Sequence, residues 1–176
     1  YNGAATEVVV PNSVKIIGWE AFLNCIGITS VVLPDSVREI RDGSYERGAF
    51  AGCTTLISIV IPNSVQKIGS LAFKDCKSLT SVTIPDSVQT IGVRSFDGCG
   101  SLTSVNIPDS VQTIGWGAFS GCSSLASVTI PTSVQEIGAC AFSGCSSLTS
   151  VSIPSSVKRI DESAFEGCTA LRKVKI

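Results

Sequence analysis

Short stretches of alternating apolar and polar residues return at a constant interval along this chain. In one of them, Val82 and Ile84 point to one side and Ser81 and Thr83 to the other. This alternation is typical of a half-buried β-strand. Proline follows each stretch and cannot donate to a strand ladder, so we expect each strand to end there.

All phenylalanines and all prolines of the chain fall into two columns of an internal repeat. The columns are Phe22, Phe50, Phe73, Phe96, Phe119, Phe142 and Phe165, and Pro11, Pro34, Pro62, Pro85, Pro108, Pro131 and Pro154. The interval is the same throughout each column, except for one longer interval that ends at Phe50 and at Pro62. Such a repeat predicts a stacked solenoid, with successive coils burying one another's apolar side chains.

The repeat predicts that residues 1–176 form a single solenoid domain. We expect a partial repeat, 1–10, followed by full repeats at 11–33, 34–61, 62–84, 85–107, 108–130, 131–153 and 154–176. The second full repeat carries a five-residue insertion near 41–47. Within a repeat such as 85–107, Val88 and Ile91 predict a second, short extended stretch on the opposite wall. The segment Ser95–Cys99 is too short for an α-helix and fits a 3₁₀ turn.

Three further columns carry structural predictions. Asparagine, aspartate or glycine precedes each column cysteine, as at Asn24, Asp75 and Gly98, which predicts a left-handed backbone at this corner. The serine two residues after each proline, such as Ser87, is expected to bond turn amides. Each phenylalanine is expected to contribute about equally to folding stability, because each coil contacts only its neighbours.

Seven of the eight cysteines also form one column: Cys25, Cys53, Cys76, Cys99, Cys122, Cys145 and Cys168. Coils about 4.8 Å apart would allow buried free thiols, which we favour, or disulfides between neighbours. A metal site is the third alternative, although single stacked cysteines lack the usual C-x-x-C spacing.

Composition excludes several classes of function. The net charge is −1, which gives no basic surface for nucleic acid, and no apolar run approaches the length of a membrane helix. The chain has no histidine, the commonest general base and metal ligand. We therefore expect no enzyme activity, no cofactor and no direct membrane insertion.

The strand signature L-x-x-V-x-I, preceded by P-x-S-V-x-x-I-G-x-x-A-F-x-G-C, resembles the BspA-like leucine-rich repeats of bacterial and protozoan surface proteins. The resemblance covers about Ala5 to Ile176. It departs from the family pattern at the insertion and at Arg41 and Asp161 in the glycine column. It implies a β-rich leucine-rich-repeat solenoid with a parallel β-sheet on its concave face, and short strands and 3₁₀ turns on the opposite wall. It also implies extracellular or cell-surface display and adhesion to host proteins, matrix proteins or other cells.

Two surfaces are candidates for binding a protein partner. The insertion gathers charged residues and a tyrosine: Arg38, Arg41, Asp42, Tyr45, Glu46 and Arg47. Arginine and tyrosine are the anchor types that interfaces prefer, and insertions in repeats often lie on a binding face. The outward strand positions form a second surface of small polar residues: Ser81, Thr83, Ser104, Asn106, Ser127 and Thr129.

Two functions are compatible with these surfaces. The leading hypothesis is a non-enzymatic recognition or adhesion module. The alternative is a structural scaffold or spacer within a larger assembly, for which the nearly uncharged middle repeats would provide a packing surface. The absence of methionine suggests that the chain is a fragment or a processed product.

Overall fold

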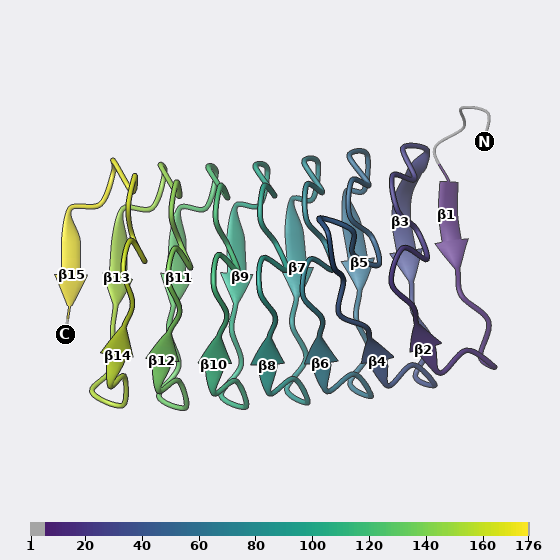
Figure 1. Ribbon diagram of the computed structural model, residues 1–176, viewed down its shortest axis with the longest axis horizontal. Helices are drawn as coiled ribbons and strands as arrows, with labels where there is room; N and C mark the ends of the chain where they lie inside the picture. Colours follow the sequence, from purple (N-terminus) through teal and green to yellow (C-terminus); the bar gives the residue numbers. More distant parts are fainter. Residues whose placement is uncertain (1–5, 176) are drawn as a thin grey trace.

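The computed structural model describes residues 6–175, which wind into successive coils stacked along one axis (Figure 1). The described residues contain β-strands and turns and no helix. Each coil places one strand in a large sheet and one in a small sheet, and both sheets are parallel. The prediction of a β-rich solenoid with a parallel sheet is confirmed.

The large sheet takes one strand from each coil in chain order. Its strands are β1 (Thr6–Val9), β3 (Ile28–Val32), β5 (Ser58–Val60), β7 (Ser81–Thr83), β9 (Ser104–Asn106), β11 (Ser127–Thr129), β13 (Ser150–Ser152) and β15 (Lys173–Lys175). The small sheet forms the opposite wall from two-residue strands. They are β2 (Ile16–Ile17), β4 (Glu39–Ile40), β6 (Lys67–Ile68), β8 (Thr90–Ile91), β10 (Thr113–Ile114), β12 (Glu136–Ile137) and β14 (Arg159–Ile160).

Strand pairing follows the sequence repeat residue by residue. Ser81 pairs with Ser104, which in turn pairs with Ser127, so equivalent positions lie beside one another along the stack. Within β7, Val82 is buried while Ser81 and Thr83 are exposed. Shifting the register by one residue would turn the valine column toward water, so burial of that column fixes the pairing.

A column of stacked phenylalanine rings runs through the interior of the solenoid. Neighbouring centroids lie 4.9–5.4 Å apart, and the planes differ by no more than 10°. The five inner rings are fully buried, whereas Phe22 and Phe165 are only partly buried, since each has a stacking neighbour on one side. From this difference in burial we expect the two end rings to contribute less to stability than the inner rings.

The corner that carries the phenylalanines contains two left-handed positions in most coils. The predicted column before cysteine has positive φ in all seven coils, from 55° at Asn24 to 74° at Gly98. A second column was not predicted; it contains Glu20, Leu71, Arg94, Gly117, Cys140 and Ser163. Because left-handed residues interrupt the i→i+3 hydrogen bonds, the corner consists of single turns rather than a continuous 3₁₀ segment.

This corner also builds a third hydrogen-bonded ladder along the stack. In the fourth full repeat, the amides of Arg94, Phe96 and Gly98 donate to carbonyls of the next coil, each at 2.8 Å. The acceptors are Trp116, Ala118 and Ser120. The left-handed positions turn these amides parallel to the stack axis. These backbone amides therefore have hydrogen-bond acceptors although the corner forms no strand.

Column side chains add hydrogen bonds between coils. The Ser110 hydroxyl donates to the Val88 carbonyl of the preceding coil at 2.6 Å, and the same bond recurs along the column. The expectation that these serines bond turn amides is wrong, because those amides already donate to the proline carbonyl, as Val88 does to Pro85.

The cysteine column consists of free thiols. Each inner thiol donates to a phenylalanine carbonyl of the preceding coil, as Cys99 does to Phe73 at 3.2 Å. Burial raises the pKa of Cys53 and of Cys145 to about 12 and raises the pKa of Cys99 well above its usual value. These thiols therefore act as protonated core residues with an axial hydrogen bond.

Candidate functional site

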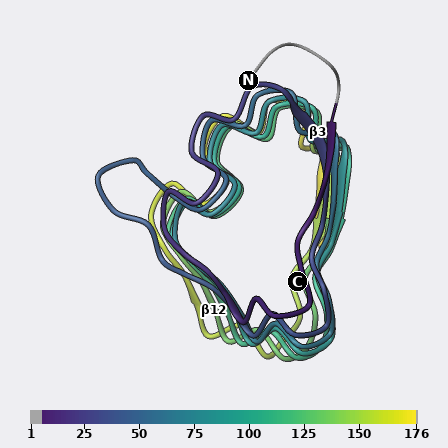
Figure 2. The same cartoon turned by 90° about the vertical axis from the view of Figure 1, so that its right-hand side faces the viewer.

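The insertion forms a tight hairpin that stands out from the small-sheet side of the solenoid (Figure 2). Ser44 and Arg47 exchange both backbone hydrogen bonds, at 3.1 and 3.0 Å. Tyr45 and Glu46 between them have φ of 49° and 66°. Positive φ at both central residues is the pattern of a type I′ turn, which is usually made by Asn-Gly. Non-glycine residues in this conformation cost of order 1 kcal/mol each or more.

Glycines at the base of the hairpin allow the close approach of backbone. A Cβ at Gly43 would lie 2.1 Å from the Arg47 carbonyl oxygen, and one at Gly48 would lie 1.9 Å from the Leu71 carbonyl oxygen. The Gly43 amide also donates to Ser70 in the next coil at 2.8 Å. The base of the insertion is thus packed into the wall rather than hanging from it.

Ion pairs tie the hairpin to coils on both sides. Arg47 reaches back to Glu20 at 2.8 Å. Asp42 pairs with Lys67 and accepts the Ser70 amide at 2.8 Å. Burial works against the Asp42 charge, but the bonds from Lys67 and Ser70 outweigh it and lower the pKa of this carboxyl.

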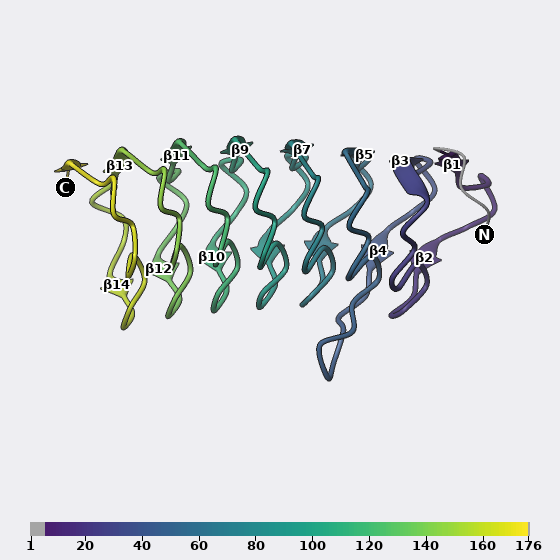
Figure 3. The same cartoon turned by 90° about the horizontal axis from the view of Figure 1, so that it is seen from above.

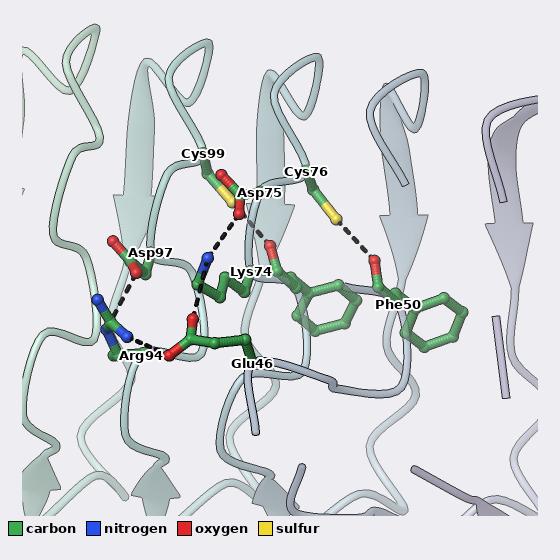
Figure 4. Close-up of polar contacts among 9 residues, drawn as sticks. Glu46, Phe50, Lys74, Asp75, Cys76, Arg94, Asp97 and Cys99 are labelled. Atoms are coloured by element: carbon green, nitrogen blue, oxygen red, sulfur yellow. Dashed lines mark hydrogen bonds and ion pairs between the residues drawn. The ribbon is translucent and has the colours of Figure 1, made fainter. Parts of the chain in front are cut away.

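Glu46 makes the longest connection in sequence (Figure 4). Its carboxylate lies 3.2 Å from the Lys74 ammonium and 2.7 Å from the Arg94 guanidinium, 48 residues away. Lys74 also pairs with Asp75 at 2.6 Å, and Arg94 pairs with Asp97 at 3.1 Å. The hairpin therefore contacts two coils beyond its own.

Burial and charge pairing act in opposite directions within this network. Burial disfavours the Lys74 charge, yet its bonds to Asp75 and Glu46 raise the pKa of the ammonium. Burial raises the pKa of Asp97 despite the nearby Arg94. At neutral pH the network is an alternating set of positive and negative groups.

The structure separates the predicted insertion residues into two kinds. Asp42, Glu46 and Arg47 are engaged with the scaffold, and Arg41 lies 3.8 Å from Glu39. Tyr45, at the tip, is 91% exposed. Arg38 is exposed directly before β4. The charged residues hold the hairpin in place, and Tyr45 is the side chain that the hairpin exposes to solvent.

The sheet-face residues lie on the other wall. All six are exposed: Ser81 and Thr83 on β7, Ser104 and Asn106 on β9, and Ser127 and Thr129 on β11. Figure 2 shows the large sheet on the side of the coil opposite the hairpin. The fold therefore does not unite the two predicted surfaces into one site.

Sequence reasoning missed three exposed apolar side chains that share one repeat column at the corner from which the hairpin emerges. Trp19 is 52% exposed, Val93 38% and Trp116 47%, and Arg47 of the hairpin occupies the same repeat position. The Arg94 guanidinium lies 5.1 Å from the Trp116 ring centroid. The available signal was that both tryptophans of the chain fall in one column, directly after the glycine position.

Among residues 6–175, no group of three or more potential ligands is placed to hold a metal ion. The same residues contain no helical segment with the length and apolar character needed to cross a bilayer. Exposed Tyr and Trp beside Arg are the residue types that dominate protein interfaces.

Comparison with known proteins identifies the repeat. Residues 1–47 and 43–172 match the family described as BspA type leucine rich repeat region, in six copies. No curated protein sequence matches the chain.

Three solved structures resemble the chain over nearly its whole length. The leucine-rich repeat protein of T. pallidum has a TM-score of 0.85 and 34% identity, over 97% of this chain and 79% of that protein. A leucine-rich repeat protein of Bacteroides ovatus has a TM-score of 0.68 and 32% identity, over 96% of this chain and 54% of that one. A leucine-rich cell surface protein of Faecalibacterium prausnitzii gives 0.67 and 29%, over 96% and 59%. The chain thus spans little more than half of the latter two structures.

Proposed function

The chain belongs to the BspA-type leucine-rich repeat family, and we propose that it is a protein-recognition module of a secreted or cell-surface protein that acts in adhesion. Family and fold are those of repeat proteins that interact with other proteins and are typically non-enzymatic. The surface location is supported by one similar structure being that of a cell surface protein.

One observation carries the proposal: the single interruption of the repeat is a braced hairpin with a tyrosine at its tip. Ion pairs to Glu20, Lys67 and Arg94 fix the hairpin from both sides, and Tyr45 is 91% exposed. Pre-ordering a loop reduces the entropy lost on binding.

Deleting residues 42–46 tests this proposal. The deletion restores the regular repeat spacing, leaving Arg41, Arg47 and Gly48 in the three positions between Ile40 and Ala49. The wild-type chain is expected to bind at least one of fibronectin, laminin, fibrinogen and collagen by biolayer interferometry, and the deletion to weaken that binding by about tenfold or more. An unchanged circular dichroism spectrum is the folding control. Binding to none of the four, or equal binding by both chains, would count against the proposal.

A scaffold role has its own supporting observation. Residues 98–157 contain only two charged residues, Asp109 and Glu136, and their outward strand positions are small and polar. Such a surface suits lateral packing between copies. Sedimentation velocity across a concentration series separates the two functions, since a scaffold is expected to associate through this face and an adhesion module to remain monomeric.

A further inference from the structure

The hairpin and the apolar corner column together form a step on the surface. Gly43 and Arg47, at the base and the end of the hairpin, are anchored in this corner. The Glu46–Arg94 pair draws the tip toward the later coils, so the hairpin leans over the third and fourth full repeats rather than back over the first. Figure 3 shows it standing clear of the other turns.

Beyond Ser70, which bonds to Asp42 of the hairpin, two exposed apolar side chains form the floor of the step. Val93 and Trp116 occupy successive coils of the same column, and the Arg94 amide donates to the Trp116 carbonyl at 2.8 Å, which fixes their spacing. Ala139 continues the column in the next coil. Tyr45 on the wall and Trp116 on the floor provide the large rigid side chains.

The charges around the step are already paired with one another. Arg94 contacts Glu46, Asp97 and the Trp116 ring, while Lys74 contacts Glu46 and Asp75. A charged partner would have to compete with these contacts, because every charged group of this network already has a neighbour of opposite sign. An uncharged partner leaves every pair intact and removes apolar area from water.

We propose that Tyr45, Val93 and Trp116 form the docking surface for an uncharged, apolar segment of a protein partner. Arg94 is a positioning residue: it holds the wall through Glu46 and the floor through Trp116. This inference rests on the proposed recognition function and specifies the partner chemistry at that site.

The chain supplies a matched control. Trp19 is the other tryptophan of the column and is exposed to a similar degree, 52% against 47% for Trp116. It lies in the coil before the insertion-bearing repeat, whereas the hairpin leans toward the later coils. If the partner docks at the step, binding depends on Trp116 and not on Trp19. If binding is nonspecifically hydrophobic, it depends on the two tryptophans equally.

The experiment selects binders from a random dodecapeptide library displayed on phage. Selected peptides are expected to be rich in apolar and aromatic residues and to carry little charge. Affinities measured by fluorescence anisotropy are expected to fall about tenfold or more for Trp116→Ala and Tyr45→Ala and to change less than about twofold for Trp19→Ala. Arg94→Gln is expected to weaken binding less than Trp116→Ala, and its melting temperature reports whether the scaffold is intact.

Three outcomes would overturn the inference: no peptide is selected, the selected peptides are highly charged, or Trp19→Ala and Trp116→Ala weaken binding equally. The sheet-face variant Ser104→Arg/Ser127→Arg separates this failure from failure of the proposed function. If that variant loses matrix-protein binding while Trp116→Ala retains it, protein recognition stands and the docking surface lies on the other wall.

Discussion

The regular coils and the insertion-bearing coil are held together by different forces. In repeats 62–153, each coil contributes a fully buried phenylalanine and cysteine and bonds to its neighbours through backbone amides. The hairpin of residues 41–47 buries little and is held mainly by ion pairs whose side chains are partly exposed. Buried aromatic area supplies kilocalories per residue, whereas exposed ion pairs supply tenths. The regular coils therefore provide most of the folding stability. The insertion provides a distinct surface and changes the free energy of unfolding little.

Removing one inner ring should produce the largest effect. Phe96→Ala leaves a cavity between two stacked neighbours 5.2 and 5.3 Å away, and we expect a loss of about 3–5 kcal/mol in the free energy of unfolding. Phe165→Ala, at a partly buried end of the stack, should cost less than half as much. Urea titration measures both, and equal losses would mean that the end ring is as well packed as the inner one.

Gly92 tests the closeness of coils in the regular region. A Cβ there would lie 2.6 Å from backbone atoms of Gly69 and Ser70, whereas at Gly18, in the same column, it would meet nothing within 4 Å. We expect Gly92→Ala to cost about 1–3 kcal/mol and Gly18→Ala to change stability by less than about 0.5 kcal/mol. Similar melting temperatures for the two variants would contradict the close approach of the coils at Gly92.

Alkaline pH should weaken the regular coils through the thiol column. Burial raises the folded-state pKa of Cys53 and Cys145 from 9.0 to about 12, so the folded chain holds these protons longer than the unfolded chain. The contribution of these thiols to the free energy of unfolding is fully present below pH 9. It declines as the pH rises toward 12, by roughly 1.4 kcal/mol per pH unit for each such thiol.

Urea titrations between pH 8 and 10.5, under reducing conditions, measure the slope of this decline. The double variant Cys53→Ala/Cys145→Ala should show a shallower decline, because it lacks two of the buried thiols. An identical slope would exclude these two thiols as its cause.

The hairpin clamp should show the smallest effect on stability. A double-mutant cycle of Glu46→Gln and Arg94→Gln is expected to give a coupling energy of about 0.3–1 kcal/mol that decreases as salt is raised. Thermal unfolding at low and high sodium chloride measures it. A coupling well above this range, or one insensitive to salt, would place the clamp among the main sources of stability and remove the contrast between the two regions.

The column predictions differ in how far the repeat alone determined them. Asn24, Asp75 and the glycines of their column were predicted to be left-handed and are, because few residue types tolerate that conformation. Arg94 and Leu71 also adopt it, although their side chains give no such signal; the axial ladder of the corner imposes it. The serine column shows the same limit, since composition indicated a hydrogen bond but not which backbone group was free to accept it.

The order of residues alone determined the solenoid, the pairing register, the buried aromatic and thiol columns and the place of the insertion. It did so because a constant repeat length brings equivalent positions together in every coil. Tertiary structure decided what the insertion presents. Glu46 meets Arg94 and Arg47 meets Glu20, and only the stacking distance together with the lean of the hairpin selects these partners among the many charges of the chain. That selection turns the tip that carries Tyr45 toward the coils of the exposed Val93 and Trp116, an arrangement that no spacing in the sequence encodes.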